Sequence, residues 1–261
     1  MNNTLKNYGL IIKKPDPRDY ILGAAPIPFP VINEIGDWTD SLPVKEFQNL
    51  NNIEPYACVP FTILNCVETL IKYKYGIETN WSDRFLAAIS DTRKNNGSVP
   101  QDVCYLLHKM GVPPQKVWPF DETIDTLDKF FAPIPDEIHA IAEEFKVWDF
   151  KYAHVPATDF GIEEGLKRSP CLFSAAAWFE QNGLYYRPTG MEDNHATTLF
   201  FQRKEEFRRV FDTYDSPHIK DYRYSDLPLM AMCFKVTKKT NVDKKPSFWE
   251  WIKAIIKAIF K

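Results

Sequence analysis

The clearest helical pattern in the chain lies between residues 58 and 75. Gly76 provides a stop signal, and Pro60 is tolerated only in a first turn, where its missing N–H costs no hydrogen bond. The spacing of the apolar positions is that of the buried face of a helix, and these positions are Phe61, Leu64, Val67, Leu70 and Ile71. The pattern predicts a helix within residues 58–75, with Cys58 at or just before its N-terminus.

Further helix signals occur in the first half of the chain. Ser82 is a typical N-cap residue and predicts a helix that runs to about Lys94. Residues 100–110 predict a third helix, closed by Gly111, and Asn96–Gly97 forms a turn before it. Residues 136–145 are the fourth candidate.

The second half of the chain carries strand patterns instead. Short apolar runs bounded by turn residues predict strands at 171–178, 195–202, 207–213 and 230–236. Helices followed by strands are typical of an α+β fold, and we place the change of character near residues 146–155.

The two ends of the chain differ from its centre. Residues 1–36 are rich in proline and predict an extended lead-in, with ordered structure beginning near Asp37–Trp38. Residues 237–247 predict a polar linker. Residues Phe248–Lys261 predict a basic amphipathic helix that binds a membrane surface or a protein partner, or that packs on its own domain.

Composition narrows the function classes. A net charge of −3 gives no support for nucleic-acid binding. No apolar run reaches the roughly 18 residues of a membrane-spanning helix, and the N-terminus lacks a signal-peptide core. We therefore expect a cytoplasmic protein, or a virion-associated one delivered without a signal.

Metal and cofactor sites have little support in the sequence. The five cysteines form no CxxC pair, so a zinc site is not expected, and we expect four of them to be small buried residues. Glu192, Asp193 and His195 lie close together but lack a second histidine at helical spacing. No phosphate-binding glycine motif occurs. We predict neither a metal nor a cofactor.

Cys58 is the best candidate for a reactive group. A helix N-terminus stabilises a thiolate, and so does a neighbouring imidazolium. His195 heads an apolar strand, which places it at a strand end facing a cleft, whereas His218 is the other serious candidate but heads no such strand. The alternative for Cys58 is simple burial.

Motifs around these residues resemble the papain family from Trp38 to Val236. Asp37-Trp38, Pro43-Val44-Lys45 with Gln48, and Cys58-Val59-Pro60-Phe61 are similar to the family's DW, PVKNQ and CWAF segments. Glu68 matches a buried glutamate on the family's central helix. Residues 96–100 are similar to the family's groove-lining glycine stretch, and residues 111–120 to its YGI…YPY passage. Asn194-His195-Ala196 is similar to the family's DHA, and Tyr214-Asp215-Ser216 lies where the family has the Asn-Ser of NSW.

The resemblance implies a role for each matching residue. Cys58 would attack the scissile carbonyl, His195 would hold the thiolate and protonate the leaving amine, and Gln48 would donate to the oxyanion. Asp215 would orient His195, with Asp212 as its rival for that role. The groove would be lined by Asn96, Gly97, Ser98, Val99 and Asn194.

Several residues depart from the family pattern. The loop between Gln48 and Cys58 is longer, Val59 replaces a tryptophan, and Ser98 replaces a glycine. Pro217 stands where the family has the tryptophan that shields the orienting residue. The family's disulfide cysteine is absent, which suits a reducing compartment.

The resemblance implies a papain-like two-lobed α+β fold of the bacterial and phage type. Residues 1–36 would form the lead-in and possible pro-segment, 37–236 the peptidase domain with lobes at about 37–150 and 151–236, and 237–261 the tail. The implied function is peptide-bond hydrolysis, with the small residues Ser174–Ala177 leaving room for a bulky apolar side chain in the second subsite. The alternatives are an inactive peptide-binding relative, a thiol amidase acting on cell-wall peptides, and a carrier for a functional tail.

Overall fold

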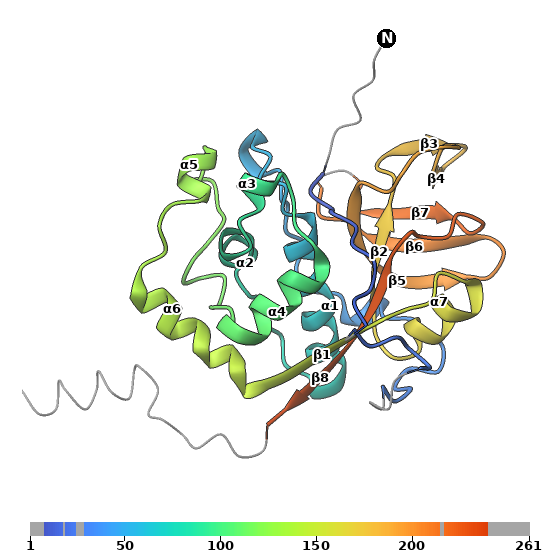
Figure 1. Ribbon diagram of the computed structural model, residues 1–261, viewed down its shortest axis with the longest axis horizontal. Coiled ribbons are helices and arrows are strands. Elements are labelled where there is room, and N and C mark those ends of the chain that lie inside the picture. The colour runs from blue at the N-terminus through green and yellow to red at the C-terminus, as the bar shows by residue number, and fades with distance from the viewer. Residues whose placement is uncertain (1–7, 18, 25–28, 215–216, 240–261) are drawn as a thin grey trace, which may run out of the picture.

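The computed structural model describes residues 8–17, 19–24, 29–214 and 217–239. Helices gather on one side of the molecule and most strands on the other (Figure 1). The helices are α1 (Cys58–Tyr75), α2 (Asp83–Ile89), α3 (Thr92–Asn95), α4 (Pro100–Met110), α5 (Leu127–Phe130), α6 (Asp136–Ala142) and α7 (Asp159–Leu166). Short 3₁₀ turns cover Thr39–Ser41, Leu50–Asn52 and Glu143–Val147.

The helix α1 is the central element of the fold and has the predicted bounds. Its residues from Cys58 to Ile71 are all buried, because it contacts α2 and α4 on one side and the strands on the other. Gly76 ends it in the left-handed conformation, at φ 64°, which glycine adopts without steric cost.

The other three predicted helices are present, two of them with shorter or interrupted bounds. Ser82 caps α2 through its hydroxyl, which accepts a hydrogen bond from Phe85 N. This helix stops at Ile89, because Asp91 takes a positive φ of 51° before the separate turn α3. The helix α4 has its predicted bounds, whereas α6 ends at Ala142 and continues as a 3₁₀ turn.

The strands form one sheet with the order β1-β8-β2-β5-β6-β7-β4-β3. Their bounds are β1 Trp148–His154, β2 Cys171–Ala175, β3 Phe179–Gln181, β4 Leu184–Tyr186, β5 His195–Arg203, β6 Phe207–Phe211, β7 Ile219–Arg223 and β8 Ala231–Lys238. The β2–β5 register pairs Ala175 with His195, and the β6–β7 register pairs Phe211 with Ile219. These registers bring the start of β5 and the end of β6 close to the N-terminus of α1.

Four strands and two helices were not predicted from the sequence, and one of these helices, α5, is a single turn of four residues. The strands β3, β4 and β7 are short and mostly half-buried, and β1 carries charged residues, so none presents a long apolar run. The helix α7 contains two glycines, which lower its helical signal. The strand β8 continues through Lys238, so the prediction that a linker begins at residue 237 was wrong. The predicted tail helix at 248–261 lies outside the described residues.

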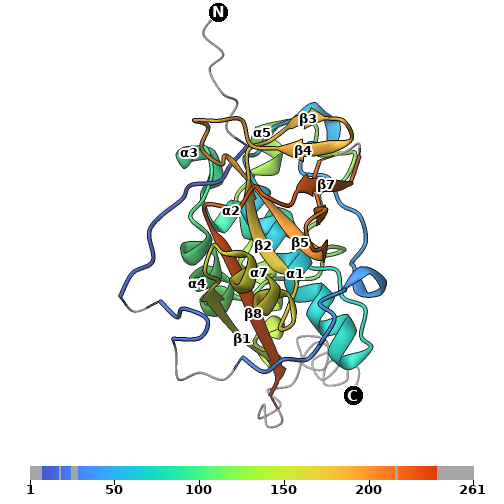
Figure 2. The ribbon, with the colours of Figure 1, turned by 90° about the vertical axis from the view of Figure 1, so that its right-hand side faces the viewer.

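The N-terminal lead-in is extended, as predicted, but it makes ordered contacts well before Asp37. Residues 8–11, which we call the strap, belong to the blue lead-in, which runs between the helical and the strand-rich sides in Figure 1 and along one edge of the molecule in Figure 2. Leu10 forms a parallel bridge with Ser98, and Ile21 forms one with His154 on β1. The expectation that ordered structure begins near Asp37 was therefore wrong.

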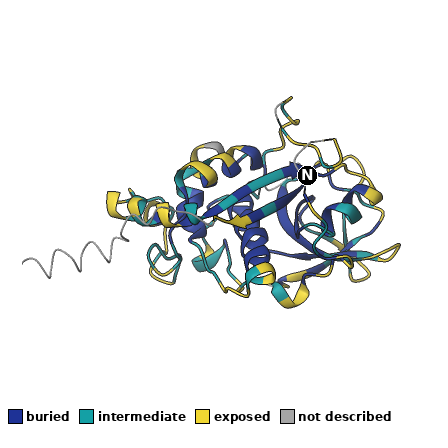
Figure 3. Ribbon diagram, turned by 90° about the horizontal axis from the view of Figure 1, so that it is seen from below, coloured by how far each residue is buried: buried dark blue, intermediate teal, exposed yellow. Residues whose placement is uncertain are grey.

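A continuous buried core runs through both sides of the molecule (Figure 3). It joins apolar residues of α1 to those of β2, β5 and β8. Within the described ranges, no helix has the length and apolar character needed to cross a membrane. The core holds α1 rigidly against the sheet, which fixes the distance between the residues at their facing ends.

Candidate active site

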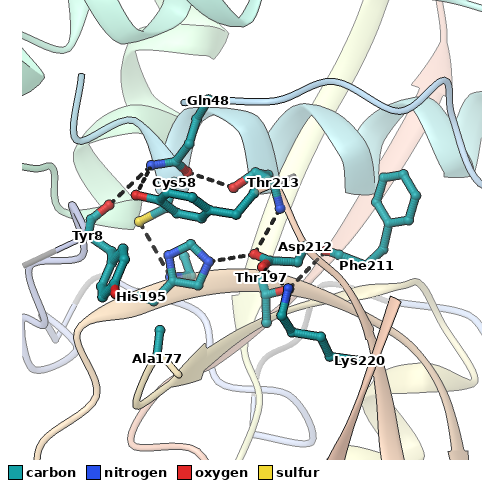
Figure 4. Close-up of polar contacts among 12 residues, drawn as sticks. Tyr8, Gln48, Cys58, Ala177, His195, Thr197, Phe211, Asp212, Thr213 and Lys220 are labelled. Carbon is teal, nitrogen blue, oxygen red and sulfur yellow. Dashed lines mark hydrogen bonds and ion pairs between the residues drawn. The ribbon is translucent and has the colours of Figure 1, made fainter. Parts of the chain in front are cut away.

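Cys58 is the first residue of α1 and is completely buried. Its sulfur and the His195 ring face each other across the junction between helix and sheet (Figure 4). The backbone N–H of Ala196 donates to the Cys58 sulfur at 3.4 Å. The structure therefore brings together the thiol and the imidazole that the sequence singled out.

The imidazole of His195 is held by Asp212. The Nε2 atom of His195 lies 2.7 Å from Oδ1 of Asp212, and both side chains are completely buried. The other ring nitrogen, Nδ1, has no hydrogen-bond partner among the described residues. That nitrogen is therefore available to exchange a proton with the thiol.

Asp215, which the resemblance favoured for this role, lies outside the described residues. The residue that contacts His195 is its rival Asp212, which follows directly after the last residue of β6. The Asp212 backbone N–H donates to His218 O at 2.7 Å, and its Oδ1 accepts from Thr213 N at 2.8 Å. These bonds fix the strand end so that the carboxylate turns toward β5.

Lys220 is a member of the site that the sequence did not reveal. Its Nζ donates to Oδ2 of Asp212 at 2.5 Å and also to Pro217 O, and the side chain is buried. Burial acts to raise the pKa of Asp212, but the charges and hydrogen bonds of His195 and Lys220 outweigh it. The pKa of Asp212 is therefore lowered, and the carboxylate stays ionised.

Three aromatic rings surround the imidazole. The rings of Tyr8, Trp178 and Tyr214 approach it edge to face, with centroid separations of 5.6, 5.2 and 5.4 Å. Trp178 precedes β3, far in sequence from Pro217, where the family pattern has its shielding tryptophan. A tryptophan shield is thus present, but it comes from a different part of the chain.

Gln48 lies beside the thiol and is tightly held. Its backbone N–H donates to Thr213 O at 2.8 Å, and its Oε1 accepts from Thr213 Oγ1 at 2.6 Å. Its Nε2 donates to Tyr214 Oη at 2.9 Å and to Glu54 Oε1 at 3.2 Å. The long loop before Cys58 therefore supplies Glu54, a carboxylate that the sequence analysis did not single out.

The strap lies next to this group, along the residues that the sequence analysis assigned to a groove. Tyr8 N donates to Asn194 O at 3.2 Å, and Gln48 Nε2 lies 3.5 Å from Tyr8 O. Ser98 N donates to Gly9 O at 2.9 Å, and Ile11 N donates to Ser98 O at 3.1 Å. These are the backbone bonds that an extended peptide makes when it adds to a strand edge.

Two glycines permit this close approach. An added Cβ at Gly9 would lie 2.2 Å from Tyr56 O, and one at Gly97 would lie 2.5 Å from Gly9 O. Both residues have positive φ, 111° for Gly9 and 139° for Gly97. The groove and the strap thus fit each other only with glycine at these positions.

The covered thiol is not poised as a thiolate in this conformation. Burial is the main cause that raises the pKa of Cys58, and Glu54 and Asp212 add to the increase. The N–H groups of Ala196 and Val59 act in the opposite direction. Burial is therefore the largest obstacle to forming a thiolate at Cys58 in this conformation.

The other residues that the sequence analysis assigned to a groove lie next to the strap and before β5. Asn96 ends α3, Val99 is the N-cap residue of α4, and Gly97 and Ser98 between them contact the strap. Ala177 N donates to Asn194 Oδ1 at 2.9 Å, which ties the β2 end to the residue before His195. Among the described residues, no group of His, Cys, Asp and Glu could hold a metal.

Solved structures with a similar fold are cysteine proteases. Xylellain, a cysteine protease from Xylella fastidiosa, is 18% identical, with a TM-score of 0.63 over 91% of this chain and 97% of that one. The bromelain protease from Ananas comosus, in complex with the E64 inhibitor, is 15% identical, with a TM-score of 0.57 over 76% and 97%. Digestive procathepsin L 3 of Tenebrio molitor is 12% identical, with a TM-score of 0.56 over 82% and 72%.

Comparison of the amino-acid sequence alone finds no relative. Neither the protein-family models nor the curated proteins contain a match to this chain. At these identities the structural likeness shows the fold, so the catalytic roles depend on the geometry described above. The chain has the α+β fold of the papain-like cysteine proteases.

Proposed function

We propose that the protein is a cysteine peptidase in which Cys58 is the nucleophile and His195 the general base and acid. The observation that carries the proposal is the buried alignment of Cys58, His195 and Asp212, with a distance of 2.7 Å between His195 Nε2 and Asp212 Oδ1. An imidazole held in this way can accept a proton on its other nitrogen.

The reaction follows from these positions. The Cys58 thiol gives its proton to His195, and the thiolate attacks the carbonyl carbon of the peptide bond. His195 then protonates the amine as the carbon–nitrogen bond breaks, leaving a thioester on Cys58. Water attacks that thioester with His195 as base, which releases the acid and restores the thiol.

Gln48 supports the proposal as an oxyanion donor. Its Nε2 already lies 3.5 Å from a peptide carbonyl oxygen, that of Tyr8. The backbone N–H of Cys58, in the first turn of α1, has no intrahelical acceptor and is the second candidate donor. Preorganised donors of this kind stabilise the charge that develops in the transition state.

We further propose that this conformation is latent and that the strap must leave before a substrate binds. Tyr8–Ile11 takes up the backbone groups of Ser98 and Asn194 that an extended substrate would use. The substrate class is an extended peptide, with a bulky apolar residue facing Ser174–Ala177.

The experiment is digestion of a denatured protein, such as casein, by the full-length chain and by Cys58→Ala and His195→Ala variants. We expect cleavage only with an intact Cys58–His195 pair, and faster cleavage once the strap is displaced. Equal cleavage by the Cys58→Ala variant would overturn the proposal.

A further inference from the structure

Asp212 has a second partner that the proposed mechanism does not use. Its Oδ1 is bound to His195, while its Oδ2 is bound to Lys220 at 2.5 Å. We propose that Lys220 is a positioning residue that cancels the charge of Asp212, so that His195 meets an acceptor of no net charge. The inference rests on the proposed function, since it concerns the same site.

The geometry isolates the Lys220–Asp212 pair from water. Lys220 lies on β7, with its side chain 3% exposed, and Asp212 is completely buried. The Lys220 Nζ lies 4.8 Å from the Trp178 ring centroid and 5.7 Å from that of Tyr185. Aromatic faces stabilise a cation without neutralising its charge. Among the described residues, Asp212 is the only carboxylate within ion-pair distance of Lys220, so it alone balances the charge of the lysine.

The two carboxylate oxygens of Asp212 bind different partners. Oδ1 accepts from His195 and from Thr213 N, and Oδ2 accepts from Lys220. A carboxylate with a cation on its far oxygen presents the near oxygen much as an uncharged amide would. Asp212 with Lys220 can therefore orient the imidazole as a neutral acceptor does, whereas an uncompensated buried aspartate would favour the imidazolium strongly.

The other ionisable groups around the site are few. Glu54 and Asp212 act on Cys58, Asp212 acts on Tyr185 and Tyr214, and Lys45, Lys220 and Asp212 act on His218. None of the others replaces Lys220, because among the described residues only its Nζ contacts Oδ2 of Asp212.

The charge balance predicts opposite effects for the two single substitutions. Lys220→Met leaves the aspartate uncompensated, so both the loss of the imidazole proton and the formation of the thiolate move to higher pH. Asp212→Asn leaves the lysine uncompensated, so both move to lower pH. The double variant Asp212→Asn/Lys220→Met restores a neutral acceptor and should keep the wild-type pH range.

The test uses full-length protein with two readouts that need no peptide substrate. Carbon-13 histidine NMR follows the titration of His195 in the closed chain. Iodoacetamide alkylation of Cys58 over a pH series, in a Gly9→Ala background that opens the strap, follows the thiolate. Arg209→Met/Asp221→Asn is the matched control. It removes another ion pair between β6 and β7, in which Arg209 Nε lies 2.7 Å from Asp221 Oδ1.

We expect midpoint shifts of about one pH unit or more, upward for Lys220→Met and downward for Asp212→Asn. The double variant should stay within about half a unit of wild type. Unshifted profiles in both single variants, or a double variant shifted as far as either of them, would overturn the inference. If Lys220→Met does not fold, Lys220→Gln replaces it in the same comparison.

The two proposals fail separately in this design. A protein that shows these shifts but cleaves no peptide would overturn only the peptidase proposal. A protein that cleaves peptides and shows no shift would overturn only the role of Lys220.

Discussion

At the residue scale, the site depends on buried polar groups that are held in place by hydrogen bonds. Gln48 is an example, because Thr213 holds its carbonyl oxygen and leaves its amide nitrogen directed toward the site. A donor fixed in this way costs little reorganisation when negative charge develops near it.

Replacing Gln48 should therefore slow catalysis without preventing substrate binding. We expect Gln48→Ala to lower kcat by about 10²- to 10³-fold, the usual effect of losing one oxyanion donor. The measurement is steady-state hydrolysis of a peptide substrate in the Gly9→Ala background. Gln181→Ala, on the short strand β3, serves as a control. An unchanged kcat for Gln48→Ala would remove Gln48 from the oxyanion site.

Glu68 offers a residue-scale prediction about stability. It is buried on α1, where its Oε1 accepts from Trp81 N at 2.6 Å, and burial raises its pKa well above the usual value. The folded state therefore holds a proton that the unfolded state releases above about pH 4.3. Stability should fall as the pH rises from there toward the raised pKa.

The variant Glu68→Gln keeps the oxygen acceptor but cannot ionise. We expect its free energy of unfolding to lack this decline, and to exceed that of wild type at pH 8 by on the order of 1 kcal/mol. Urea unfolding between pH 4.5 and 8 measures the difference. Parallel curves for the two proteins would show that Glu68 does not ionise on unfolding.

At the element scale, the sequence predicts best where an element is long and periodic. The bounds of α1 and α4 follow from apolar spacing and from the glycines that end them. The choice between Asp212 and Asp215 could not be made, because the direction of a side chain after a strand depends on the cross-strand bonds that end it. The role of Lys220 was not predicted, because its partner Asp212 follows the neighbouring strand β6. A contact between two strands is not visible in the local sequence pattern of either one.

The strap is also an element-scale feature, and Gly9 tests its role. An alanine there should displace the strap, since the added Cβ would lie 2.2 Å from Tyr56 O. We expect Gly9→Ala to raise the rate of Cys58 alkylation at least tenfold, because the thiol is completely buried in the closed form. Peptide mapping by mass spectrometry identifies the modified cysteine.

Gly23→Ala is the matched control for the strap. Gly23 has a positive φ of 85° in the same lead-in, but an added Cβ there would contact nothing within 4 Å. It therefore carries the conformational cost of the substitution without the steric clash. If both variants alkylate at the wild-type rate, the strap does not protect the thiol.

At the scale of the whole molecule, one core joins the helical and strand-rich sides and sets α1 against the start of β5. The α+β character and the positions of Cys58 and His195 were predictable, because each follows from a pattern within one segment. The position of the strap was not, since an extended segment carries no periodic signal and its backbone hydrogen bonds reach partners some 90 to 190 residues away in the chain.

The central claim is that Cys58 cleaves peptide bonds. Its most direct test is digestion of a peptide library by full-length Gly9→Ala protein, with and without Cys58→Ala, and identification of the new chain ends by mass spectrometry. The account predicts many new ends with Gly9→Ala, enriched in a bulky apolar residue two positions before the cut, and none when Cys58 is replaced. New ends that persist in the Cys58→Ala protein, or none from a Gly9→Ala protein whose Cys58 alkylates rapidly, would contradict it.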